Sequence, residues 1–172
     1  MVTELPAGFY IRRATPDDAS LLVDLTLRCW TGSVAGNSTA FNETIETVVD
    51  QLLHGGAAIV SAGETPVGSG RFYPVSGPPG DPRKWIEIKR VGILKSHRKL
   101  GLAGPLVAVL ESEARSRGYA GAQLGVRHDQ PRLVAFWESV GYRLANDVTL
   151  HTPNPLTPPP TFMRKAFQLP SS

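Results

Sequence analysis

The chain has 172 residues, 41% of them hydrophobic, a net charge of +3 and one cysteine, so we expect a single globular domain over residues 1–172. No apolar run reaches the ~20 residues of a membrane helix, and no secretory signal is found, which together predict a cytoplasmic protein that does not enter a membrane. The lone cysteine excludes an internal disulfide and a multi-cysteine metal site, and we expect no bound metal.

Turn residues and hydrophobic periodicity predict helices that alternate with strands. In chain order, the expected elements are a strand over 9–12, a helix beginning at Thr15, a helix over 43–54, strands over 57–60, 67–75 and 85–93, a helix over 102–117, a strand over 122–126, a helix over 131–140, and strands over 142–150 and 161–168. Proline-rich stretches at 74–82 and 152–160 are expected to be loops, which at this length often border a binding site. The order predicts an α/β fold with a mixed central sheet and helices on both of its faces.

Basic residues are concentrated in one segment. Seven of the 18 Lys and Arg residues lie within residues 83–99, where Glu87 is the only acidic residue. A run of this kind is usually a solvated face. Because this run precedes a glycine-containing turn, we favour a local site for a polyanion over a broad surface for nucleic acid.

The turn after this segment has the features of an anion site. It leads into the helix over 102–117, whose first turn offers free N–H groups and the positive end of the helix dipole. Gly101 and Ala103 carry little or no side chain, so an anion can approach the backbone closely, and Arg98 and Lys99 would add positive charge. A plain strand–helix connection, with the glycine serving turn geometry, is the alternative.

The sequence of this turn also matches a known motif. Arg98-Lys99-Leu100-Gly101-Leu102-Ala103 fits neither the P-loop nor the dinucleotide-binding pattern, but it resembles Arg/Gln-x-x-Gly-x-Gly/Ala, the acetyl-CoA motif of the GCN5-related N-acetyltransferases (GNAT family). Residues 91–94 are similar to the splayed strand of that family, 133–142 to its helix ending in Gly-Phe/Tyr, and 11–19 to its N-terminal segments. The resemblance covers most of the chain, and the four segments follow the family's order.

This resemblance implies the GNAT fold and transfer of an acetyl group from acetyl-CoA, the co-substrate, to an amine that attacks the thioester directly. It also implies that the pyrophosphate binds the amides of residues 99–104 and that a backbone N–H near Ile93 polarises the thioester carbonyl. The residues expected to bind CoA are Val91, Ile93, Arg98, Lys99, Gly101, Leu102, Ala103, Gly104, Gln130 and Trp137.

Three of these positions differ from the family pattern. Lys99 replaces a frequent glycine, and Gln130 falls where the family has an asparagine that contacts CoA. Trp137 falls where a tyrosine is often proposed to protonate the leaving thiolate, and an indole N–H cannot deliver a proton. We therefore expect Trp137 to pack against the CoA arm and no general acid to be essential; Tyr142 is the alternative acid, or more simply a core aromatic.

Glu87 is the expected general base. Its spacing from Arg98 equals that between the strand glutamate and the Arg/Gln motif in the histone-acetylating branch of the family. Only the free amine attacks a thioester, so a base must take a proton from the ammonium group. The alternative is a surface glutamate paired with Lys89 or Arg90. His97, His128 and His151 are candidate proton relays, although a loop histidine with no identified partner is more often solvated.

The expected acceptor is a primary amine of a small molecule. Polyamines, aminoglycosides, amino acids, and protein N-termini or lysines all stay open. The alternative function is a CoA-binding regulatory or sensor domain of the same fold without turnover, which the missing tyrosine permits. A nucleic-acid partner is set aside, and a homodimer is left open.

Overall fold

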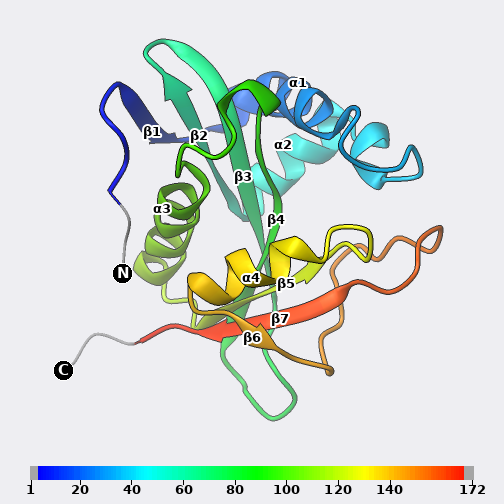
Figure 1. Ribbon diagram of the computed structural model, residues 1–172. Coiled ribbons are helices and arrows are strands. Elements are labelled where there is room, and N and C mark those ends of the chain that lie inside the picture. Colours follow the sequence, from blue (N-terminus) through cyan, green and yellow to red (C-terminus); the bar gives the residue numbers. More distant parts are fainter. Residues whose placement is uncertain (1–3, 169–172) are drawn as a thin grey trace.

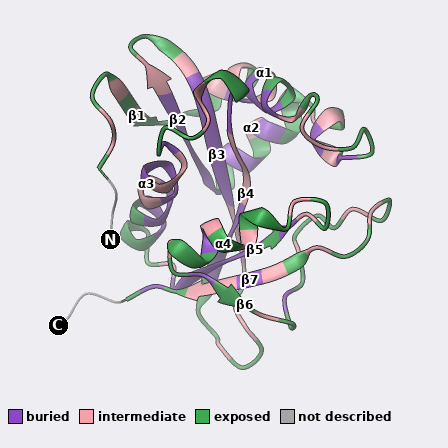
Figure 2. Cartoon of the chain, in the orientation of Figure 1, coloured by how far each residue is buried: buried purple, intermediate pink, exposed green. Residues whose placement is uncertain are grey.

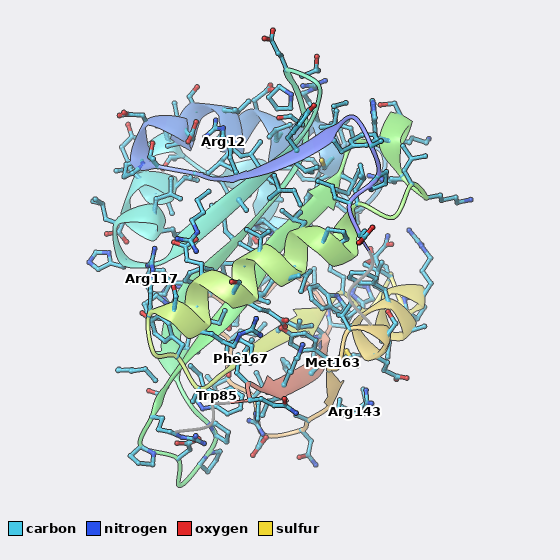
Figure 3. All side chains as sticks on the ribbon, turned by 90° about the vertical axis from the view of Figure 1, so that its left-hand side faces the viewer. Arg12, Trp85, Arg117, Arg143, Met163 and Phe167 are labelled. Atoms are coloured by element: carbon cyan, nitrogen blue, oxygen red, sulfur yellow. The ribbon has the colours of Figure 1, made fainter. Side chains whose placement is uncertain are left out.

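The structure, a computed structural model, describes residues 4–168 and is built around a seven-stranded sheet (Figure 1). Its strands are β1 Phe9–Arg13, β2 Gly56–Ala62, β3 Thr65–Ser76, β4 Lys84–Ile93, β5 Gly121–Val126, β6 Arg143–Leu144 and β7 Thr161–Ala166. Their order is β1-β2-β3-β4-β5-β7-β6, and among these described strands only the neighbours β4 and β5 run parallel. Figure 3 accordingly places Arg12 of β1 at one end of the sheet and Arg143 and Met163 of β6 and β7 at the other.

Helices cover both faces of this sheet, and Figure 2 shows the buried strands between them. They are α1 Ala19–Trp30, α2 Ile45–His54, α3 Ala103–Ser116 and α4 Arg132–Ser139. Ala57 and Ile59 of β2 pack in one core with residues of α1 and α2, whereas Ala58 and Val60 belong to a second core with residues of α3 and α4. The expected mixed sheet with helices on both faces is confirmed. Over residues 4–168, no helix has both the length and the apolar character needed to cross a membrane.

The start of α2 shows how a helix cap positions a charged residue. Thr44 Oγ1 accepts a hydrogen bond from the Thr47 N–H at 3.1 Å, and α2 therefore begins at Ile45. Glu43, which we expected to be the first helical residue, lies before this cap in an extended conformation. Its carboxylate is consequently available to the neighbouring strand β3.

One expected strand, over residues 142–150, is wrong for most of its length. Strand β6 ends after two residues, and the chain then forms a loop over 145–160, here called the β6–β7 loop. The Ala145 N–H still donates to the Phe162 carbonyl of β7, but other backbone groups of this loop bond to side chains: one carbonyl accepts from Gln123 Nε2, and the N–H of His151 donates to Glu87 Oε1. These bonds hold the β6–β7 loop against β4 and β5.

Candidate active site

The parallel strands β4 and β5 separate after a short pairing. They pair only at Ile86 with Ala122 and at Glu87 with Gln123. Beyond these positions the remainder of β4 has no partner among the described strands on its β5 side. We call this unpaired edge and the space beside it the β4–β5 opening.

The unpaired edge of β4 carries backbone hydrogen-bond donors. The Leu94 N–H donates to the Val67 carbonyl of β3 at 2.8 Å. Because N–H groups alternate in direction along an extended strand, those of Ile93 and Val91 point away from β3, toward the opening. These are the two strand positions at which we expect the extended arm of CoA to bind.

A β-bulge distorts β4 beside the opening. Arg90 and Val91 both lie opposite Gly70 of β3, and Arg90 has a φ of +57°. This left-handed conformation costs about 1–3 kcal/mol for a residue with a side chain and is typical of functional positions. Bulges also occur often next to active sites, where they redirect side chains.

The turn before α3 offers a row of backbone amides. Lys99 and Gly101 have φ values of +65° and +78°, and no described residue accepts a hydrogen bond from the N–H groups of residues 99–104. A Cβ added to Gly101 or Gly104 would have no heavy atom within 4 Å. Free amides and open space at the N-terminus of a 14-residue helix fit the pyrophosphate of CoA.

Arg98 and Gln130 donate hydrogen bonds to residues outside this amide row. Arg98 donates from Nε to the Ile93 carbonyl at 2.9 Å, from Nη1 to Ser33 Oγ at 3.1 Å and from Nη2 to the Cys29 carbonyl at 2.8 Å. Gln130 Nε2 donates to the Ser33 carbonyl at 2.9 Å. Both side chains tie the end of α1 and the segment after it to the two sides of the opening, and a contact of either with CoA stays a prediction.

Glu87 lies at the closed end of the opening, where β4 and β5 still pair. It is 3% exposed, which excludes the surface alternative. Its Oε1 accepts hydrogen bonds from Gln123 Nε2 and from the His151 N–H, both at 2.9 Å. Its Oε2 lies 3.6 Å from Lys89 Nζ. One carboxylate oxygen is therefore fixed, and the other has only a long contact with an ammonium group.

Lys89 and His151 both lie beside the carboxylate of Glu87, Lys89 next to its second oxygen, Oε2. Lys89 Nζ donates to Thr152 Oγ1 at 3.0 Å and lies 3.4 Å from His151 Nδ1, and the His151 ring stacks on Tyr73 with 4.1 Å between centroids. Burial lowers the pKa of Lys89, although the charge of Glu87 opposes this. Burial and then the charge of Lys89 lower the pKa of His151, which favours its neutral ring. An ammonium group can only donate, so in this contact Nδ1 is the acceptor. His151, one of the three candidate relay histidines, therefore lies beside Glu87 and Lys89 and is not solvated on all sides; a role for it in proton transfer stays a prediction.

A second buried charge cluster lies on the same face of the sheet. Arg71 of β3 is 1% exposed and pairs with Glu43 through two hydrogen bonds of 2.6 and 3.0 Å. Arg90 Nε also lies 3.3 Å from Glu43 Oε2, and Arg90 Nη2 donates to Thr39 Oγ1. Arg71 was not among the expected site residues; the signal available was a single charged residue in the middle of a strand that is otherwise uncharged.

Trp137 and Tyr142 belong to the core. They are 8% and 0% exposed, and the Trp137 ring packs edge-on against Phe136 and Tyr142 with 5.1 Å between centroids in each case. The Tyr142 hydroxyl donates to Glu111 Oε2 of α3 at 2.8 Å. Burial, and then the negative charge of Glu111, raise the pKa of Tyr142. The structure therefore places Tyr142 as a core aromatic, and contact of Trp137 with CoA stays a prediction.

Neither the single thiol, that of Cys29, nor the described His, Asp and Glu residues indicate thiol or metal catalysis at this site. Cys29 is 3% exposed, and burial raises its pKa to about 11, although Arg98 and Arg28 oppose the shift. A thiol in this state is not a nucleophile near neutral pH. Over residues 4–168, no three His, Cys, Asp or Glu residues form a group that could hold a metal ion.

Comparisons with known proteins identify one family. The sequence model of the acetyltransferase (GNAT) family matches residues 21–142. YjcF of Bacillus subtilis, described as an uncharacterized N-acetyltransferase, is 32% identical over 107 residues, which cover 62% of this chain and 69% of YjcF. An acetyltransferase from Streptococcus agalactiae has a similar structure, with a TM-score of 0.72 and 17% identity over 94% of this chain and 100% of that one. The PaiA N-acetyltransferase from Thermoplasma acidophilum, solved in complex with coenzyme A, gives a TM-score of 0.71 and 13% identity over 92% and 99%.

Proposed function

The chain belongs to the GNAT family of acetyltransferases, and from this premise we propose that it is an acetyl-CoA-dependent N-acetyltransferase acting on the amine of a small molecule. The observation that carries the proposal is the β4–β5 opening, which has free amides at residues 99–104 at one end and the buried carboxylate of Glu87 at the other. This arrangement suits a long anionic ligand whose reactive end lies near a base.

Binding and polarisation are assigned to the backbone. The N–H groups of residues 99–104 bind the pyrophosphate, and those of Val91 and Ile93 pair with the extended arm. One of these two strand N–H groups donates to the thioester oxygen and stabilises the negative charge that develops on it. Acetyl-CoA supplies the activated acetyl group.

Proton removal is assigned to Glu87. Its fixed Oε1 orients the carboxylate, and Oε2 accepts a proton from the acceptor ammonium, directly or through water. The free amine then attacks the carbonyl carbon, the C–N bond forms and the C–S bond breaks. The thiolate is a good leaving group, so water or the proton lost from nitrogen can neutralise it without a dedicated acid.

A second candidate function follows from Trp137. Because its indole cannot deliver a proton, the chain is also compatible with a CoA-binding sensor that performs no turnover. In that case acetyl-CoA binds, but no amine is acetylated.

One experiment separates the two functions. Acetyl-CoA is incubated with the protein and a panel of amines, thiol release is followed, and products are identified by the mass of one added acetyl group. Calorimetry with acetyl-CoA runs in parallel. We expect amine-dependent thiol release; binding without release for every amine would favour the sensor, and absence of binding would overturn both.

A further inference from the structure

We propose that the acceptor carries a negatively charged group, such as a carboxylate, in addition to its amine, and that Arg90 binds this group. The inference rests on the proposed function and narrows it to one class of acceptor. It concerns the face of the sheet covered by α1, α2 and the β6–β7 loop, on which Glu87 and Arg71 lie.

The buried side chains around this end of the opening carry an excess of positive charge. Three cations, Lys89 and Arg90 of β4 and Arg71 of β3, face two carboxylates, Glu43 and Glu87. Farther out, Arg127 pairs with Asp129, and the charge of the exposed Asp50 of α2 reaches His151. Two arginines share Glu43, because both Arg71 and Arg90 contact it. The charges of Arg71 and Arg127 add to burial in lowering the pKa of Arg90, although Glu43 opposes them.

Arg90 is fixed in place but has hydrogen-bonding capacity to spare. Glu43 and Thr39 hold its Nε and Nη2, and no described residue accepts a hydrogen bond from its Nη1. The side chain is 19% exposed, and its backbone stands in the strained bulge beside the opening. A pre-positioned guanidinium with a free donor is well suited to bind a carboxylate.

The carboxylates of this region are already engaged, which disfavours polycationic acceptors. Both oxygens of Glu43 contact arginines, and Oε1 of Glu87 accepts two hydrogen bonds. A second ammonium group beside Lys89 and Arg90 would therefore have no buried carboxylate to itself, because Glu87 Oε2 is assigned to the reacting amine and Asp50 is exposed. An anionic group on the acceptor would instead offset the repulsion among the cations Lys89, Arg90 and Arg71. These cations also lower the pKa of a nearby ammonium group, which favours the neutral amine that attacks the thioester.

The test compares acceptors that differ only in one charge. For several chain lengths, the acetylation rates of an amino acid, its carboxamide and the diamine of equal length are measured, and kcat/KM is expressed per free amine. We expect the amino acid to be preferred over the carboxamide by roughly tenfold to a hundredfold, as for a charge-assisted contact, and the diamine to be the poorest acceptor.

Variants then locate the contact. Arg90→Gln should reduce the preference to near unity, mainly through KM for the amino acid, whereas Arg90→Lys should keep part of it. Lys84→Gln removes an exposed charge from the same strand and should leave the preference unchanged. Calorimetry with acetyl-CoA and thermal unfolding verify that each variant is folded.

The outcomes are distinct. If carboxamides or diamines are acetylated as well as the amino acids by the wild-type protein, this inference is wrong and the proposed function stands. If the preference persists in folded Arg90→Gln, the assignment to Arg90 is wrong. If no amine in the panel is acetylated, the proposed function itself fails.

Discussion

Glu43 and Arg71 form a buried ion pair that joins the segment before α2 to the middle of β3. Arg71 Nη2 lies 2.6 Å from Glu43 Oε1, and Nη1 lies 3.0 Å from Oε2. Arg71 also donates to Gln51 Oε1 and Thr26 Oγ1, so residues of both α1 and α2 surround its charge. The pair therefore fixes both helices on the face of the sheet that carries Glu87.

Removing the charge of Glu43 should destabilise the fold strongly. Glu43→Gln leaves the buried Arg71 without its carboxylate, and breaking a buried pair in this way typically costs about 3–5 kcal/mol. Urea denaturation followed by tryptophan fluorescence measures the loss. Glu46→Gln, at an exposed position in the first turn of α2, is the matched control and should change the free energy of unfolding little.

The Glu43–Arg71 ion pair should also make the free energy of unfolding depend on pH. Burial acts to raise the pKa of Glu43, but the hydrogen bonds and charges of Arg71 and Arg90 outweigh it, and the pKa is lowered from its usual 4.5. The stabilisation is thus fully present above pH 4.5 and is lost as the pH falls through the lower, folded-state pKa. Wild-type stability should fall more steeply in acid than that of Glu43→Gln; equal slopes would contradict a lowered pKa.

Features encoded by local sequence were predictable. The helix expected over 102–117 is observed as Ala103–Ser116, because periodicity and turn residues fix such boundaries. The strand expected over 142–150 was not, because long-range bonds to Glu87 and Gln123 determine the path of the β6–β7 loop. A pattern within one segment carries no information about such bonds.

The residues of the candidate site were also predictable only where the local sequence determines their contacts. The amide turn at residues 99–104 follows from its own short motif. The partners of Arg98 and Gln130 do not, since Ser33 is 65 and 97 residues away from them in sequence. Both side chains bond to Ser33, and nothing in the motif itself indicates that contact.

Filling the space beside the amide turn should weaken CoA binding without damage to the fold. Gly104 lies in the first turn of α3, and a Cβ there meets no heavy atom within 4 Å. Gly104→Ala should leave the free energy of unfolding unchanged or raise it by up to about 1 kcal/mol, the helix propensity gain. Calorimetry should show weaker binding of CoA, because the new methyl group crowds the pyrophosphate.

Substitution of Gly104 rather than Gly101 tests crowding of the ligand without adding backbone strain. Gly101 has a φ of +78°, so any substitution there is strained even before a ligand binds. Gly36 also has open space around its Cβ, and Gly36→Ala is the control for the mutation type. CoA affinity equal to wild type in a larger variant, Gly104→Val, would show that the pyrophosphate binds elsewhere.

Glu87→Gln should abolish base catalysis while keeping the local geometry. The amide oxygen can still accept from Gln123 and from the His151 N–H, as the carboxylate does at 2.9 Å. We expect kcat to fall by ~10²–10⁴ at neutral pH and to recover partly at high pH, where free amine is abundant. Glu64→Gln, in the exposed turn between β2 and β3, should behave as wild type. If the rate of Glu87→Gln equals that of wild type over the whole pH range, Glu87 is not the general base.

Turnover should not depend on a general acid at Trp137 or Tyr142. Trp137 is a core residue with an indole that cannot donate a proton, so Trp137→Phe should keep most of the activity. Trp137→Tyr should not raise it by the ~10²-fold or more expected if proton delivery were limiting. Both variants are measured for kcat and for CoA affinity.

Tyr142→Phe distinguishes a structural hydroxyl from an acid. Its hydroxyl donates to Glu111 Oε2 at 2.8 Å, while Lys165 Nζ occupies Glu111 Oε1 at 2.9 Å. Loss of the hydroxyl leaves one buried carboxylate oxygen without its donor, which should lower the free energy of unfolding by about 1–3 kcal/mol. The turnover of the folded variant should match wild type. A large loss of kcat confined to Tyr142→Phe, with CoA affinity intact, would mean that an acid is required and that Tyr142 reaches the thiolate in the reacting complex.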